Sequence, residues 1–78
     1  MPRITKIDFA LSGEYVEVNQ LLKLAGACDS GGAGKQLVAE GRVSVDGQPE
    51  ARKTAKIRAG QVVRCGGLQI TVVAGADA

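Results

Sequence analysis

The sequence of 78 residues leaves room for one compact domain, and we expect residues 1–78 to form it. With 45% hydrophobic and 23% charged residues, the composition is that of an ordinary globular protein and excludes a disordered chain. Charged residues interrupt the apolar positions of the first 16 residues, and no apolar run approaches the length that spans a bilayer. We therefore expect a cytoplasmic protein with no secretion signal and no membrane partner.

The absence of histidine excludes Ser/His/Asp and Cys/His catalytic arrangements as well as imidazole ligands to a metal. Cys28 and Cys65 are the only thiols, and two cysteines cannot supply the four ligands of a structural zinc site. In a reducing cytoplasm we expect them to behave as small buried hydrophobes rather than as a disulfide. The acidic residues show no spacing typical of a general acid and base. We expect no enzymatic activity, no metal and no cofactor.

The net charge of +2 is weak evidence for a polyanionic partner, but the charges are unevenly distributed. Residues 35–64 contain seven basic and three acidic side chains, a balance of +4, whereas the rest of the chain has a balance of −2. A concentration of cations in one part of a chain is typical of a nucleic-acid-binding surface.

The predicted elements begin with a strand and a pair of helices. Alternation of apolar and polar residues over 7–11 predicts a strand ending at Ser12 and Gly13. Apolar residues at helical spacing predict a first helix over residues 18–25, with Gly26 as its end. A second helix starts with Asp29 or Ser30 as its cap and ends at Gly41. Glycines in its first turn weaken its helix propensity, so its order has to come from packing against the first helix.

Strand and turn signals fill the second half of the chain. Residues 42–45 alternate in polarity, and Asp46-Gly47 is a strong signal for a tight turn between strands. Residues 48–55 contain Pro49 and predict a partly irregular connection. Gly66-Gly67 joins residues 61–65 and 68–73 as a hairpin, and we expect residues 75–78 to be a flexible tail. The predicted fold is α+β, with two packed helices against a small, mostly antiparallel β-sheet.

Two candidate ligand motifs are weak. Residues 31–35 read Gly-Gly-Ala-Gly-Lys, but a phosphate-binding loop requires glycine at the position of Asp29 and a hydroxyl at that of Gln36. The second helix start and Lys35 are still able to hold one phosphate, although Lys35 is equally well explained as a solvated lysine. Phe9 and Tyr15 are the only aromatic residues, and we interpret both as core or rim residues. Any nucleic-acid contact should therefore rely on phosphates, sugars and shape.

Residues 18–63 resemble the RNA-binding domain first known from ribosomal small-subunit protein four, also called the αL motif. The resemblance rests on residues 21–24, on Asp29-Ser30 at the helix start, and on residues 41–47, which read Gly-x-Val-x-Val-Asp-Gly. Residues 56–63 complete the pattern with a glycine before the last motif strand. The small size and the Arg52-Lys53 pair in the loop are most similar to the stand-alone bacterial proteins of the YbcJ type.

The resemblance implies a monomeric, non-catalytic module whose basic surface binds structured RNA, such as ribosomal or transfer RNA, and which associates with the ribosome. Relatives that are enzymes carry catalysis on other domains. Carried over position by position, the resemblance implies phosphate contacts from cations on the helices and in the loop after the Asp-Gly turn: Lys35, Arg42, Arg52, Lys53 and Lys56, with Lys23 and Arg58 in second rank.

Two other functions fit parts of the sequence. In a protein-interaction adaptor, an apolar patch or an open strand edge would hold the partner, and the basic loop would only tune association. A sulfur carrier of the β-grasp kind would need a terminal Gly-Gly, which residues 74–78 lack.

Overall fold

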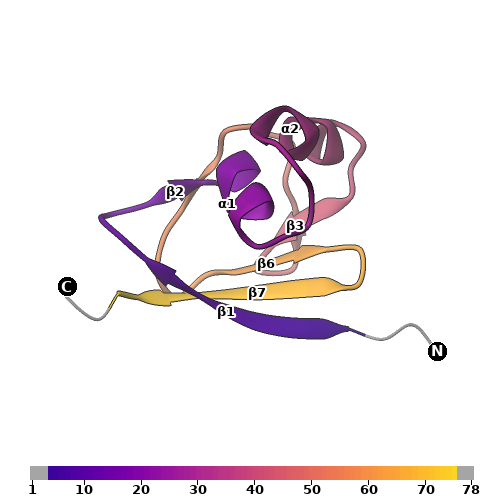
Figure 1. The fold of residues 1–78 in the computed structure, drawn as a ribbon. Coiled ribbons are helices and arrows are strands. Elements are labelled where there is room, and N and C mark those ends of the chain that lie inside the picture. The colour runs from indigo at the N-terminus through magenta and orange to yellow at the C-terminus, as the bar shows by residue number, and fades with distance from the viewer. Residues whose placement is uncertain (1–3, 76–78) are drawn as a thin grey trace.

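The computed structural model describes residues 4–75, in which a pair of helices packs on one face of a β-sheet (Figure 1). The elements in chain order are β1 Thr5–Leu11, β2 Val16–Glu17, α1 Val18–Leu24, α2 Gly31–Ala39, β3 Val43–Val45, β4 Gln48–Pro49, β5 Lys56–Ile57, β6 Val62–Cys65 and β7 Leu68–Ala74. This arrangement confirms the predicted α+β fold of two helices against a mostly antiparallel sheet. The predicted tail at 75–78 lies, apart from Gly75, outside the described residues.

The main sheet has five strands in the order β1-β7-β6-β3-β4. Three of its four pairings are antiparallel, and β1 runs parallel to β7 from Thr5↔Leu68 to Leu11↔Ala74. A second, two-stranded ribbon pairs β2 with β5 in antiparallel register, with Val16 opposite Ile57 and Glu17 opposite Lys56. Segments that are about forty residues apart in the sequence therefore lie side by side next to the start of α1.

The tight turn predicted at Asp46-Gly47 joins β3 to β4. Asp46 has φ 51° and Gly47 has φ 82°, the pair of positive values that defines the hairpin turn matching strand twist. The Asp46 carboxylate also accepts hydrogen bonds from Val62 N at 2.9 Å and from Gln61 Nε2 at 3.4 Å. This residue therefore ties the turn to the start of β6, in addition to its local role.

Local signals set the ends of both helices. Helix α1 starts where Val18 N donates a hydrogen bond to Ala55 O at 2.8 Å, and it ends one residue earlier than the apolar pattern predicts. For α2, the structure selects Ser30 from the two predicted caps, because its Oγ accepts a hydrogen bond from Ala33 N at 3.1 Å. Gly41, with φ 75°, ends the second helix as predicted.

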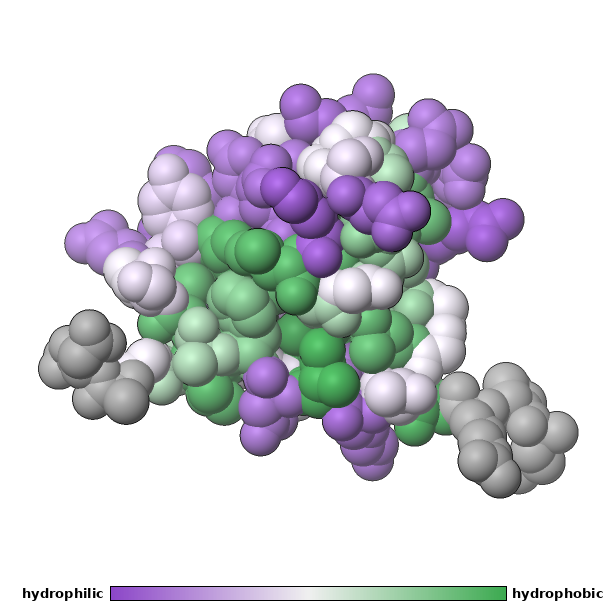
Figure 2. Space-filling model, in the orientation of Figure 1, coloured by the Kyte–Doolittle hydropathy of each residue, from purple (hydrophilic) through white to green (hydrophobic). Residues whose placement is uncertain are grey.

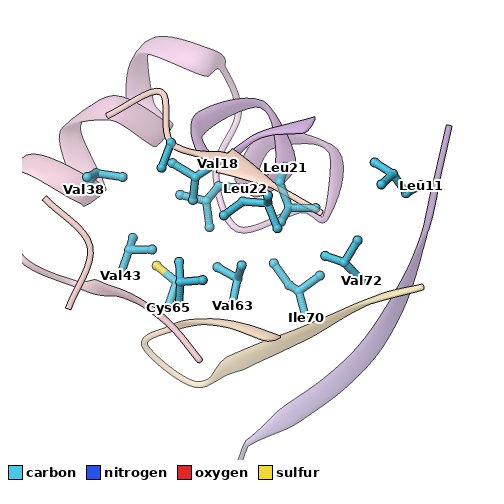
Figure 3. Packing of buried hydrophobic residues seen from close by; sticks show 13 residues of the cluster. Leu11, Val18, Leu21, Leu22, Val38, Val43, Val63, Cys65, Ile70 and Val72 are labelled. Carbon is cyan, nitrogen blue, oxygen red and sulfur yellow. The ribbon is translucent and has the colours of Figure 1, made fainter. Parts of the chain in front are cut away.

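The hydrophobic core lies between the helix pair and the sheet. Figure 3 shows Val63, Ile70 and Val72 of the sheet pointing toward Leu21 and Leu22 of α1. Because side chains alternate along a strand, the intervening residues of β6 and β7 face away from the helices. The buried set is Leu11, Val18, Leu21, Leu22, Val38, Val43, Val45, Ala55, Ile57, Val63, Cys65, Ile70 and Val72. Within residues 4–75, no helix is both long and apolar enough to cross a bilayer.

The two helices approach each other so closely that a side chain does not fit between them. A Cβ atom placed on Gly34 would lie 2.5 Å from the backbone oxygen of Asn19. The side chain of Asn19 is itself buried, at 2% exposure, and its Oδ1 has no hydrogen-bond partner. The predicted packing of the second helix against the first is thus confirmed, and Gly34 is the glycine that allows their close approach.

We expect Gly34→Ala to lower the free energy of unfolding by about 1–3 kcal/mol, because the new methyl group forces the helices apart. Gly32→Ala is the matched control, since its Cβ would meet nothing closer than Ser30 Oγ at 3.9 Å. This control should raise the free energy of unfolding by up to about 1 kcal/mol, because alanine favours the helix. Urea unfolding measures both, and equal effects of the two substitutions would contradict the close-packing explanation.

Candidate nucleic-acid interface

All seven predicted phosphate contacts are exposed in the structure. Lys23 lies in the last turn of α1 and Lys35 lies on α2. The remaining five follow in the second half of the chain: Arg42 between α2 and β3, Arg52 and Lys53 between β4 and β5, Lys56 in β5, and Arg58 directly after it. Figure 2 shows hydrophilic residues gathered over the two helices, whereas apolar residues lie below them on the side of β1.

The ribbon of β2 and β5 brings two of these cations to Tyr15. The Nζ atom of Lys56 lies 4.9 Å from the centroid of the tyrosine ring, and Cζ of Arg58 lies 5.9 Å from it. Both distances are within the range in which the ring attracts a cation. Tyr15 is 40% exposed, so it is a surface residue rather than a core residue. We call Tyr15, Lys56 and Arg58 the tyrosine cluster.

A surface hollow extends the tyrosine cluster toward the preceding loop. The hollow has a volume of about 420 Å³ and is lined by Arg52, Thr54, Ala55 and Lys56. Lys56 belongs both to this hollow and to the tyrosine cluster, so three predicted cations lie on one continuous piece of surface. We call Arg52, Lys56 and Arg58 the loop cations.

Arg52 is paired with an acid of its own loop. Its Nε lies 3.3 Å from Glu50 Oε2, and its backbone N donates a hydrogen bond to the same oxygen at 2.9 Å. The hydrogen bond from the Arg52 backbone, together with the guanidinium charge, lowers the pKa of the Glu50 carboxyl below its ordinary value, although partial burial opposes this shift. Arg42 is paired in a similar way, with its Nε 2.9 Å from Glu40 Oε1.

These ion pairs do not hold the arginines permanently. The Arg52 side chain is 81% exposed and that of Arg42 is 67% exposed. Exposed ion pairs contribute only about 0–1 kcal/mol to stability. An incoming phosphate is therefore able to take either guanidinium from its carboxylate.

The remaining lysines take no part in the contacts that join the loop cations. Neither of the two ion pairs and neither cation–ring contact within residues 4–75 involves Lys23, Lys35 or Lys53. The structure thus joins three of the seven predicted residues through shared neighbours, and it leaves the helix lysines as individual exposed charges. The placement of Tyr15 beside Lys56 and Arg58 was not predicted from the sequence, because no local pattern indicates that residues 15–17 pair with residues 56–58.

The described residues offer little for metal or thiol chemistry. Residues 4–75 contain no group of three or more histidine, cysteine, aspartate or glutamate side chains that could hold a metal ion. Cys65 is buried and Cys28 is half-buried, and both are free. Burial raises the pKa of the Cys65 thiol, so this thiol stays protonated at neutral pH and is a poor nucleophile. The prediction of a small buried hydrophobe is confirmed for Cys65.

Comparisons with known proteins agree with the predicted resemblance. The model of the S4 domain matches residues 9–73. "Putative RNA-binding protein YbcJ" of Escherichia coli (strain K12) is 50% identical over 60 residues, which are 77% of this chain and 86% of the relative. The uncharacterized protein YbcJ of Shigella flexneri gives the same figures.

The solution structure of E. coli YbcJ, described as revealing an αL motif involved in RNA-binding, has a TM-score of 0.63 to this structure. The match has 40% sequence identity and covers 95% of this chain and 92% of that one. The likeness therefore extends through nearly the whole chain. Given the family match over residues 9–73 and the 50% identity to YbcJ, this chain belongs to the S4 domain family.

Proposed function

We propose that this chain is a non-catalytic module that binds structured RNA, such as ribosomal or transfer RNA, by contacting its phosphate backbone. The observation that carries the proposal is the convergence of the loop cations, Arg52, Lys56 and Arg58, around one hollow and one exposed ring. Cations spaced along one surface neutralise successive phosphates and release the counterions held there, which favours association.

The two kinds of cation have different roles in this proposal. Arginine presents a planar fork that bonds two phosphate oxygens at once, whereas lysine acts as a compact point charge. Arg52 and Arg58 therefore orient the backbone, and Lys56 and Lys53 supply attraction. The lysines of the helices, Lys23 and Lys35, contribute to the positive field that attracts RNA to the protein.

The comparisons support RNA as the partner. The E. coli relative is named a putative RNA-binding protein, its solution structure is described as revealing an αL motif involved in RNA-binding, and the match to an S4 domain covers residues 9–73. A role in binding rather than in catalysis agrees with this family. Monomeric state and association with the ribosome remain predictions.

A protein-interaction adaptor is the second candidate function. Leu24 is 60% exposed and Ile4 is 43% exposed. Strand β1 is an edge of the five-stranded sheet, and apolar surface gathers on its side of the molecule (Figure 2). An open strand edge beside apolar side chains is able to pair with a segment of another protein. The adaptor makes no use of the loop cations, so their substitution separates the two functions.

The first test replaces two loop cations, Arg52→Ala with Lys56→Ala. With about four phosphates neutralised, the logarithm of wild-type affinity should fall with the logarithm of salt concentration at a slope near −3, and each lost contact should reduce the steepness of the slope by about 0.7–0.9. We expect the double variant to have a slope of about −1.5, because about two of four contacts are lost, and an affinity for a labelled RNA hairpin reduced about tenfold or more, measured by fluorescence anisotropy.

The matched control is Lys6→Ala with Arg64→Ala, which removes the same charge from the outer face of the sheet. This control should keep most of the wild-type slope and affinity. Equal losses in both double variants would show that only net charge matters, and unchanged binding in the loop variant would favour the adaptor.

A second prediction concerns the acid that holds Arg52. Glu50→Gln removes the charge that competes with phosphate for the Arg52 guanidinium, so affinity for the same hairpin should rise about two- to fivefold. Asp8→Asn removes one negative charge from an exposed position of β1, on the face away from the helices, and should raise affinity less. If Glu50→Gln weakens binding, Glu50 supports the site by positioning Arg52 rather than by competing with phosphate.

The Glu50 pair also predicts a pH dependence of stability. Because the pKa of Glu50 is lower in the folded chain than in the unfolded chain, its contribution is fully present above about pH 4.5 and is lost as the pH falls through the folded pKa. The free energies of unfolding of wild type and Glu50→Gln should therefore differ most above pH 5 and converge toward pH 2. Urea unfolding at a series of pH values checks this, and a pH-independent difference would contradict it.

A further inference from the structure

Tyr15 has surroundings that a phosphate-binding surface does not explain. It is the only tyrosine of the chain, and the chain has no tryptophan. Phosphates need no aromatic partner, yet the ring is 40% exposed and has two cations beside it. Contact with another apolar or planar group removes part of an exposed aromatic ring from water and is therefore favourable. The position of the ring thus points to a planar ligand group.

The ring is held in place by the ribbon rather than by a free loop. Val16 pairs with Ile57, which is only 1% exposed and so anchors the ribbon in the core. Continuing this antiparallel register by one residue brings Tyr15 opposite Arg58. The hydrogen bond from Val18 N to Ala55 O, at 2.8 Å, fixes the other end of the ribbon. Side chains on such a paired segment meet a ligand in a preformed geometry, which reduces the entropy lost on binding.

We propose that the tyrosine cluster is a subsite for an unpaired nucleotide, with the base stacked on Tyr15 and the neighbouring phosphates on Lys56 and Arg58. Stacking of a base on an aromatic side chain tolerates any base, because every base has a planar face. Bases inside an A-form duplex are already stacked on both faces, so only a bulged, looped or terminal nucleotide offers a free face. This inference rests on the proposed function and adds a preference for RNA in which a helix adjoins an unpaired nucleotide.

Stacking of a base on the ring and a purely positional role of the ring predict different effects when the ring is removed. If Tyr15 only held Lys56 and Arg58 in place, its loss would weaken binding of every RNA alike, because both cations contact phosphate. If a base stacks on the ring, its loss affects only RNA that has an unpaired base. Phenylalanine keeps the planar ring without the hydroxyl, and leucine keeps the apolar bulk without a planar face.

The test compares two RNA hairpins with the same stem, each closed by a non-nucleotide linker so that the loop adds no unpaired base; one is fully paired in the stem and the other has a single-nucleotide bulge. Wild type should bind the bulged hairpin about tenfold more tightly, as one stacked base provides. Tyr15→Leu should bind both hairpins with the wild-type affinity for the paired one, and Tyr15→Phe should keep the preference. Leu24→Ala, an exposed apolar residue outside the tyrosine cluster, is the matched control and should also keep it.

A second readout follows directly from the sequence. With one tyrosine and no tryptophan, excitation at a wavelength that phenylalanine does not absorb gives intrinsic fluorescence from Tyr15 alone. Saturation with the bulged hairpin should quench this emission more strongly than saturation with the paired hairpin, after correction for RNA absorbance. The measurement does not depend on the folding of any variant.

The outcomes distinguish failure of the nucleotide subsite from failure of the proposed RNA binding. Equal binding and equal quenching by the two hairpins would overturn the nucleotide subsite while leaving RNA binding intact. Equal loss of both hairpins in Tyr15→Leu would assign Tyr15 a purely positional role and overturn the subsite as well. Binding of neither hairpin by wild type would overturn the proposed function together with this inference.

Discussion

The architecture depends on the direct backbone contact between the two helices. Gly34 of α2 lies against the backbone of Asn19 in α1, where a Cβ atom would be 2.5 Å from the Asn19 oxygen. This close approach lets two short helices form one thin layer, so that side chains from both reach the same sheet. It also fixes the position of α1. The hydrogen bond from Val18 N, at the start of α1, to Ala55 O then fixes the loop that contains the basic residues relative to the helix. The contact is therefore a condition for the geometry of the candidate site.

The arginines on the resulting surface are held by weak ion pairs. Arg42 and Arg52 each rest on an acid two residues away, and such exposed pairs contribute little to stability. Each pair orders one guanidinium group without holding it strongly. A protein with a net charge of only +2 can thus present a local concentration of cations that becomes available when a polyanion arrives.

Membership in the S4 domain family and the similarity to YbcJ show to which family the fold belongs. The structure adds how the individual residues are arranged. Ribbon β2–β5 is small, with two residues in each strand, yet it positions the loop cations relative to Tyr15. Its inner residues belong to the core, so the stability of the fold and the geometry of the proposed RNA contact share the same side chains.

The sequence by itself determined the elements that depend on near neighbours. The Asp46-Gly47 turn, the Gly66-Gly67 hairpin, a capped helix start at Asp29 or Ser30 and the Gly41 helix end all follow from backbone preferences that act within a few residues, and the structure then selects Ser30 as the cap. The enrichment of cations in residues 35–64 was equally visible, and it supplied all three loop cations.

Only the tertiary structure decided which of these cations share a surface. The parallel pairing of β1 with β7 and the pairing of β2 with β5 join segments about forty or more residues apart, and no local periodicity encodes such partners. Tyr15 illustrates the difference. As one aromatic residue in a sequence it fits a core as well as a rim, and its exposure beside Lys56 and Arg58 arises only when the ribbon closes. Long-range pairing is selected by burial of the whole core, which no short segment specifies.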